Sequence, residues 1–283
     1  HPTPDVSLAQ LEDRTHPAWQ RLKAEELLAQ QLSQLQSKRA RDELRAPALV
    51  LKKGGLHEQL LGVLPFGLTG AQRRVGEEIA QDLMRQVPMH RLLQGDVGSG
   101  KTIVALMTML LAIDNGYQTC LMAPTEILAR QHFNSLKELV GDGLVNIELL
   151  TGSVKAKQRK TIHEGLENGE INILIGTHAL IEEVVQFKNL GLVVIDEQHR
   201  FGVEQRSKLW KKSAVPPHVL VMTATPIPRT LAMTLYGDLD VSVINELPVG
   251  RIPIETRHFY ESQRLRMFGF MREEIAKGRQ IYI

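Results

Sequence analysis

The sequence has almost no cysteine and no long hydrophobic run. Its 283 residues include one cysteine, Cys120, which lies in an apolar stretch. A single cysteine can form neither a disulfide framework nor a cysteine-based zinc site within the chain. We therefore interpret Cys120 as a small buried residue of a strand. No stretch approaches the roughly 20 apolar residues that span a bilayer, so no membrane partner is expected.

The sequence also lacks a signal peptide and a strong charge imbalance. Residues 1–5 do not form a basic region followed by an apolar core, so we expect a cytoplasmic protein. Because the chain begins with His1 rather than methionine, we expect it to be part of a longer protein. The 34 Lys and Arg against 32 Asp and Glu give a net charge of +2. This excess is too small to indicate nucleic-acid binding, which must be judged from motifs.

The N-terminal segment has the pattern of a helical linker. Pro17 suits the first turn of a helix that would run to about Leu44. Three leucines recur at helical spacing, namely Leu28, Leu32 and Leu35. We interpret this helix as a packing element that ties two domains together. The alternative is direct DNA binding by its basic residues, Lys38, Arg39 and Arg41.

After Pro65, short apolar runs alternate with helix-length segments. The runs lie near residues 92–93, 120–122, 147–150, 173–175, 192–195 and 219–222. Such runs are typical of an α/β fold with a mostly parallel sheet covered by helices on both faces. We predict a helical linker segment at 1–64, whose Pro47–Leu64 part is a linker with a flexible stretch at Lys52–Gly55. A nucleotide-binding domain would follow at 65–258, and a second domain would begin at 259–283. Residues 280–283 would start a strand of that second domain.

The clearest motif lies at residues 95–102. It matches G-x-x-x-x-G-K-[ST] in full, with Gly95, Asp96, Val97, Gly98, Ser99, Gly100, Lys101 and Thr102. An apolar run precedes it and a helix-forming run follows, so backbone N–H groups could surround a phosphate at a helix N-terminus. Lys101 would reach the β and γ phosphates, and the Thr102 hydroxyl would bind Mg²⁺. The predicted cofactors are therefore ATP and Mg²⁺.

A pair of carboxylates follows the aliphatic run at residues 193–195. Asp196 is expected at the carboxyl end of a buried strand, where open α/β sheets bind ligands, and it would hold Mg²⁺. Glu197 is the candidate base that polarises the attacking water. His199, two residues further, is predicted to couple hydrolysis to the rest of the protein.

The Asp-Glu-Gln-His sequence at 196–199, downstream of the Gly-Lys-Thr loop, resembles superfamily 2 helicases of the DExH type. The resemblance implies a RecA-like P-loop domain. Phe66, Leu68, Thr69 and Gln72 are similar to the adenine-sensing motif of that family, with Gln72 at the base edge. The strand-end loops that contact nucleic acid in the family correspond to Pro124, Thr125, Glu126, Thr151, Gly152, Gly176, Thr177 and His178. Thr223 and Thr225 resemble the motif that links the ATP state to DNA binding.

Longer stretches narrow this resemblance. Residues 196–206 and 223–230 are similar to two groups of bacterial double-stranded DNA translocases, the RecG family of branched-DNA helicases and the transcription-repair coupling factors. Residues 65–72, 94–102 and 236–248 favour the RecG family. That family implies an ATP-driven motor that regresses replication forks and branch-migrates Holliday junctions in recombination and repair. It also implies a wedge domain before His1, a second motor domain after Ile283, and a single-stranded-DNA-binding protein as a candidate partner.

Other interpretations remain open from the sequence. A transcription-repair coupling translocase is a near alternative, and a nucleotide-gated DNA-binding module without hydrolysis is a second one. Glu197 argues against the module, because a switch does not need a water-polarising carboxylate. Arg200 would transmit the ATP state to the DNA-bound parts, whereas its neighbour Phe201 is equally well explained by core packing. The basic cluster at Lys155, Lys157, Arg159 and Lys160 is either a DNA contact or a solvated helix face.

The basic cluster can be tested directly. Replacing both Lys155 and Lys157 with glutamate should weaken DNA binding and flatten its dependence on salt, because lysines that neutralise phosphates release counterions. Fluorescence anisotropy with a labelled duplex between about 50 and 200 mM salt measures both quantities. An unchanged salt slope would assign these lysines to a solvated helix face.

Overall fold

The computed structural model describes residues 9, 12–141, 143–197, 213, 215–225, 239–248, 250 and 255–282. The chain divides into two compact units, His1–Pro248 and Val249–Ile283. This division comes before residue 258, where the sequence analysis places the end of the nucleotide-binding domain. In the part of the chain that the structure describes, no helix is both long enough and apolar enough to cross a bilayer.

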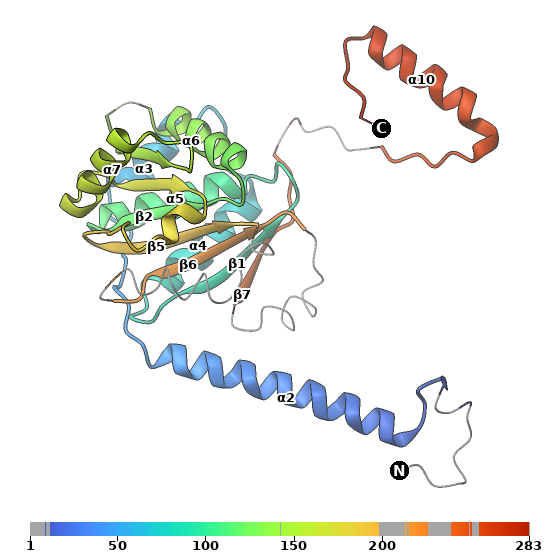
Figure 1. Cartoon of the computed structure of the whole chain (residues 1–283), viewed down its shortest axis with the longest axis horizontal. Coiled ribbons are helices and arrows are strands. Elements are labelled where there is room, and N and C mark those ends of the chain that lie inside the picture. The colour runs from blue at the N-terminus through green and yellow to red at the C-terminus, as the bar shows by residue number, and fades with distance from the viewer. Residues whose placement is uncertain are drawn as a thin grey trace. The chain divides into compact units, whose positions relative to one another are not determined.

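The larger unit is built on a seven-stranded sheet with the order β3-β4-β2-β5-β6-β1-β7 (Figure 1). The strands are β1 (His90–Gly95), β2 (Gln118–Met122), β3 (Ile147–Leu150), β4 (Ile173–Gly176), β5 (Leu190–Asp196), β6 (His218–Thr223) and β7 (Asp240–Ile244). Every neighbouring pair is parallel. The predicted α/β class and parallel sheet are therefore confirmed.

Helices cover both faces of this sheet. One core combines Leu93 and Leu121 with residues of α4 (Gly70–Leu83), α5 (Lys101–Asp114) and α6 (Glu126–Val140). The other combines Leu92 and Cys120 with residues of α7 (Ala156–Asn168). Adjacent strand residues thus point into opposite cores, which explains the near-continuous aliphatic runs. Cys120 is fully buried, as predicted.

Residues 47–64, predicted as a linker, contain a short helix. This is α3 (Leu56–Val63), which contacts α5 and buries Leu60. The Asp114 carboxylate, at the end of α5, accepts the backbone N–H groups of Leu56 at 3.0 Å and His57 at 3.4 Å. This carboxylate caps the start of α3 from far along the chain. The helix was not predicted, because its cap is not local in sequence.

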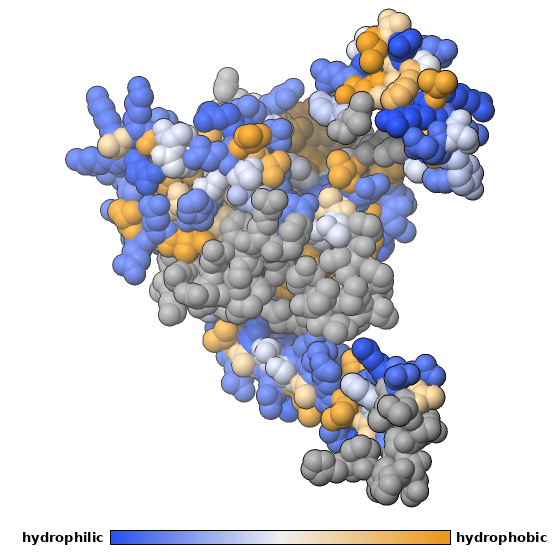
Figure 2. Space-filling model, turned by 45° about the vertical axis from the view of Figure 1, so that its right-hand side comes forward, coloured by the Kyte–Doolittle hydropathy of each residue, from blue (hydrophilic) through white to orange (hydrophobic). Residues whose placement is uncertain are grey.

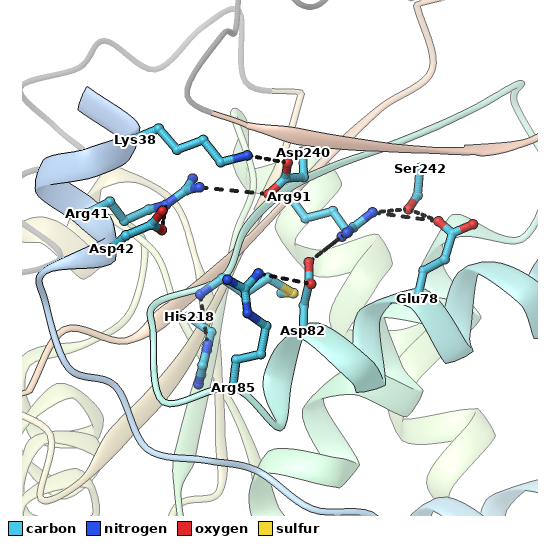
Figure 3. Close-up of polar contacts among 11 residues, drawn as sticks. Lys38, Arg41, Asp42, Glu78, Asp82, Arg85, Arg91, His218, Asp240 and Ser242 are labelled. Atoms are coloured by element: carbon cyan, nitrogen blue, oxygen red, sulfur yellow. Dashed lines mark hydrogen bonds and ion pairs between the residues drawn. The ribbon is translucent and has the colours of Figure 1, made fainter. Parts of the chain in front are cut away.

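The long helix α2 (Pro17–Asp42) is tied to the edge strand β7. Asp240 Oδ1 lies 3.3 Å from Lys38 Nζ, and Asp240 Oδ2 lies 3.8 Å from Arg41 Nη2 (Figure 3). Arg41 is only 8% exposed. These ion pairs with a protein carboxylate favour the packing-helix interpretation over direct DNA binding. Hydrophobic side chains nevertheless lie among hydrophilic ones on the surface of this helix (Figure 2), and they include Leu28, Leu32 and Leu35.

A second polar network fixes α4 against the same edge of the sheet. Arg91 on β1 donates two hydrogen bonds to Asp82 Oδ2 of α4, at 2.6 and 3.0 Å. It also donates to the Ser242 hydroxyl of β7 at 2.6 Å (Figure 3). Asp82 and Arg91 are both largely shielded from solvent. Each also has a second, longer ion pair, Asp82 with Arg85 at 3.8 Å and Arg91 with Glu78 at 3.6 Å. α4 in turn contacts the loop at residues 95–100.

The smaller unit contains a 3₁₀ turn (Glu261–Gln263) followed by α10 (Arg264–Ala276). Glu274 is its one buried residue within α10, and its carboxylate accepts hydrogen bonds from Lys277 at 2.9 Å and from Arg279. Residues 280–282 have no strand conformation. The strand predicted at 280–283 is therefore not observed over its described part.

His218, at the start of β6, connects β6 to the N-terminal segment. Its fully buried ring accepts the Met89 N–H at Nδ1, at 3.0 Å, and therefore donates from Nε2 to the Pro47 carbonyl, at 2.8 Å. Burial lowers the pKa of His218 below its ordinary value of 6.5, although the Pro47 carbonyl and the charge of Asp82 act to raise it. The folded protein thus holds this imidazole neutral.

Acid should accordingly destabilise the fold through His218. Below pH 6.5 the unfolded chain takes up a proton that the folded chain resists, so stability decreases as pH falls toward the lowered folded pKa. The decrease is at most about 1.4 kcal/mol per pH unit. In His218→Asn, urea unfolding between about pH 7.5 and 5.5 should show a lower stability at neutral pH but a smaller loss on acidification. Parallel stability curves for the two proteins would contradict this assignment.

Candidate nucleotide-binding site

The candidate site lies where the parallel strands end. β2, β5, β6 and β1 are neighbours in the sheet, and the chain leaves all four at the same edge. The loop at 95–100 follows β1, Asp196 ends β5, and Thr223 ends β6. Parallel pairing therefore gathers segments that are about a hundred residues apart in sequence, at the edge where open α/β sheets bind ligands.

The loop at residues 95–100 has the backbone of a phosphate cradle. Gly98 and Gly100 have φ values of +77° and +89°, and α5 begins at Lys101. A Cβ on Gly95 would stand 2.4 Å from Ser99 Oγ, so only glycine fits there. Ser99 Oγ is buried and has no hydrogen-bond partner among the residues that the structure describes. A helix N-terminus, left-handed glycines and an unsatisfied hydroxyl together fit a bound phosphate chain.

Lys101 lies across this loop. Its Nζ donates hydrogen bonds to the carbonyl oxygens of Gly95 at 2.8 Å and Asp96 at 3.1 Å. Both carbonyls belong to the loop, so the ammonium group lies against the cradle. Asp96, Val97 and Gly98 are exposed, whereas Lys101 and Thr102 are half-buried.

Gln72 supports the cradle from α4. Its Oε1 accepts the Thr69 N–H at 2.9 Å, and Thr69 Oγ1 accepts the Gln72 N–H at 3.2 Å, which forms a capping box. The Gln72 Nε2 donates to the Ser99 carbonyl at 2.8 Å. A Cβ on Gly100 would approach this nitrogen to 2.1 Å. The contact with adenine predicted for Gln72 stays a prediction, since both ends of its buried amide bind protein groups. Phe66, in the same motif, is half exposed.

The segment after β7 is bound to the start of α4. Glu246 Oε2 accepts the Ala71 N–H at 3.0 Å, and Arg74 donates to the Val243 carbonyl at 3.0 Å. Arg74 also donates to Asn245 Oδ1 at 3.3 Å. The helix that supports the phosphate loop is thus held by the last residues of the larger unit.

The two carboxylates predicted from sequence lie at the end of β5. Asp196 is 9% exposed. Glu197 has φ of +53°, a conformation that side chains with a Cβ rarely adopt. Its carboxylate accepts the Ala224 N–H at 3.1 Å and the Thr223 hydroxyl at 3.4 Å. These bonds join Glu197, the predicted base, to the motif at residues 223–225, which follows from the end of β6.

His132 is a site residue that sequence reasoning missed. It lies on α6, and its Nε2 is 2.7 Å from Asp196 Oδ2. No spacing in the sequence relates these two residues. Strand β2 leads into α6, and Asp196 is the last residue of β5. These two strands are neighbours in the sheet, and this adjacency was the one signal that could have suggested the contact.

The residues predicted to contact DNA fall into two groups. Glu126, Gly152, His178 and Thr225 are exposed, and Pro124 and Thr125 are half-buried. The others are buried, namely Thr151, Gly176, Thr177 and Thr223. The Thr151 hydroxyl bonds Ser153, and Thr223 Oγ1 accepts the Thr225 N–H at 3.1 Å. The Thr151 and Thr223 hydroxyls therefore shape their loops, whereas the buried Thr177 hydroxyl has no hydrogen-bond partner among the described residues. The prediction of DNA contact rests on the exposed neighbours.

The basic cluster on α7 is partly paired. Arg159 Nη1 lies 3.2 Å from Glu182 Oε2, and Lys160 Nζ lies 3.7 Å from Glu164 Oε1 in an exposed pair. Lys155 and Lys157 are exposed. His199, Arg200 and Phe201 lie outside the described residues.

Comparison with known proteins identifies related sequences and folds. Residues 69–234 match the family model described as DEAD/DEAH box helicase. The whole chain is 48% identical to the ATP-dependent DNA helicase RecG of Aquifex aeolicus and covers 36% of that protein. Over 94% of the chain it is 52% identical to the RecG of Synechocystis sp., of which it covers 32%. The chain thus spans about a third of the length of these relatives.

A solved structure supports the same relationship. The structure of RecG bound to a three-way DNA junction aligns with a TM-score of 0.81 and 42% identity, over 92% of this chain and 35% of that one. The DNA-bound helicase MrfA shares the fold at 17% identity, with a TM-score of 0.58. The RecA-like architecture predicted from the motifs is therefore confirmed.

Proposed function

Because the chain belongs to the DEAD/DEAH box helicase family, we propose that it is the ATP-binding part of a motor that acts on branched DNA. The observation that carries this proposal is the assembly of Lys101, Asp196 and Glu197 at one edge of the sheet, from strands β1 and β5. The similarity to DNA helicases named RecG supports DNA as the molecule along which this motor moves. Fork regression and Holliday-junction branch migration are the proposed activities of the longer protein.

The nucleotide would bind with its phosphates in the loop at 95–100. Backbone N–H groups of the loop, the N-terminus of α5 and Lys101 supply positive potential there. Thr102 and Asp196 would hold Mg²⁺, and oxygen donors of this kind suit that ion. When bound, the ion would offset the charge that accumulates on the phosphate oxygens.

Glu197 would orient the attacking water and accept its proton. The bonds from Ala224 and Thr223 hold this carboxylate in place despite its strained backbone. A residue kept in such a conformation by two hydrogen bonds is better explained by hydrolysis than by a nucleotide-gated binding module. Movement of the loop at 223–225 would change the position of Glu197, so DNA contact by Thr225 could influence hydrolysis.

DNA would lie along the strand-end loops. Glu126, Gly152 and His178 are exposed at the ends of segments that follow β2, β3 and β4, and the N-terminus of α6 offers N–H groups to a phosphate. The solved relative is bound to a three-way DNA junction, which supports a branched duplex as substrate over a transcription-coupled role. We also propose a cytoplasmic, nucleoid-associated location and a single-stranded-DNA-binding protein as partner, on the basis of the RecG similarity.

Two substitutions separate nucleotide binding from hydrolysis. Lys101→Ala should weaken binding of Mg-ATP about 10- to 100-fold, since it removes charge-assisted hydrogen bonds that contribute about 1.5–3 kcal/mol. Glu197→Gln should keep nucleotide affinity within a few fold of the parent while the conversion of ATP to ADP stops. Titration with a fluorescent ATP analogue and overnight product analysis, with and without a model fork, measure the two effects. Equal binding by Lys101→Ala and the parent would overturn the proposed site.

A further inference from the structure

The contact between His132 and Asp196 joins two different parts of the larger unit. The ring Nε2 and the carboxylate Oδ2 are 2.7 Å apart, and the two side chains are only 13% and 12% exposed. His132 belongs to α6, whereas Asp196 ends β5. Because the histidine contacts Oδ2, the other carboxylate oxygen, Oδ1, can turn toward a cation or its bound water.

The first turn of α6 is fixed to the neighbouring strand-end loop. Thr125 caps the helix through its Oγ1, which accepts the Leu128 N–H at 3.3 Å. Glu126 Oε2 accepts the Ser153 hydroxyl at 2.9 Å. A Cβ on Gly152 would stand 3.0 Å from Glu126 Oε1, so the carboxylate lies directly against this glycine.

The same linkage continues to the loop after β4. Ser153 Oγ is 2.9 Å from Thr151 Oγ1. Arg159 donates to the Thr151 carbonyl at 3.1 Å and to Glu182 at 3.2 Å. Two of the loops predicted to meet DNA, at 124–126 and 151–152, are therefore connected by hydrogen bonds, and Arg159 extends the connection to Glu182, which follows the third such loop. Helix α6 starts within this connected group.

We propose that His132 is a positioning residue that orients Asp196 for Mg²⁺, and that α6 thereby links this carboxylate to the DNA-contacting loops. The inference rests on the proposed function, because it assigns Asp196 to the ion. From Glu126 to His132 the helix rises about 9 Å, at 1.5 Å per residue. An α-helix of this length behaves as a rigid element, so a displacement of its first turn also moves the imidazole.

The physical role of His132 is to restrict one oxygen of the carboxylate. An N–H donated by the ring to Oδ2 would fix the rotamer of Asp196, so that Oδ1 would hold the ion. Groups that orient a metal ligand in this way typically contribute 10- to 100-fold to metal affinity. The histidine itself binds neither the nucleotide nor the ion in this account.

The test compares two substitutions of His132 in the 283-residue chain. His132→Leu removes the hydrogen bond, whereas His132→Gln keeps an N–H donor at a similar reach. Affinity for a fluorescent ADP analogue is measured with EDTA and with Mg²⁺, and the ratio of the two gives the gain due to the ion. The Leu variant should lose about 10- to 100-fold of this gain and keep its affinity in EDTA. The Gln variant should recover most of the loss.

Two controls distinguish positioning from a general structural effect. Gln131→Leu alters an exposed neighbour on the same helix and should leave the Mg²⁺ gain unchanged. Asp196→Ala should lose the gain, and adding His132→Leu to it should cause no further loss, because the histidine acts through the aspartate. A further loss in the double variant, or an equal loss of affinity in EDTA, would overturn the positioning role.

Addition of a model fork tests the link through α6. The fork should increase the Mg²⁺-dependent affinity of the parent, and His132→Leu should abolish that increase while DNA binding persists. A fork that changes the parent and the Leu variant equally, or changes neither, would overturn the link. Failure of the parent to bind nucleotide at all would instead reject the proposed function, and Lys101→Ala identifies that outcome separately.

Discussion

Burial of both faces of the sheet is the constraint on which the larger unit depends. β2, β4, β5 and β6 are buried along their whole length, so the middle of each strand is occupied mainly by apolar side chains. Burial of apolar surface stabilises the unit by roughly 25 cal/mol per Å². Polar groups are consequently concentrated at the strand ends, and parallel pairing places those ends together. The phosphate loop, the two carboxylates and the strand-end loops occupy one edge for this reason.

The helices that cover the sheet also support this edge. α4 holds the phosphate loop through Gln72 and is itself held by Arg91 and Glu246. α6 plays the corresponding part for the Asp196 carboxylate through His132. In both cases a side chain from a helix fixes a group at the end of a strand, and the start of the same helix contacts another loop. Such contacts restrict the loops without filling the space that a ligand needs.

How much of the fold and of the site could be predicted from the sequence depends on how close together in sequence the residues of each feature lie. The phosphate loop and Asp196 with Glu197 were predicted because each motif is continuous in sequence and follows an aliphatic run. β7 was missed because its residues alternate between polar and apolar, as suits an edge strand. α3 was missed because its capping carboxylate, Asp114, lies 58 residues away from Leu56. His132 and the burial of Thr151 and Thr177 depend on tertiary packing, which no spacing encodes.

Hydrogen exchange with and without Mg²⁺ and a non-hydrolysable ATP analogue tests the central claim most directly. The account predicts slower exchange at the amides of residues 97–102, which would bind phosphate, and at 70–73, where Gln72 joins α4 to that loop. Amides of α10, in the separate smaller unit, should be unchanged. Unaltered exchange at 97–102, or protection confined to another region, would contradict a nucleotide site at the strand ends.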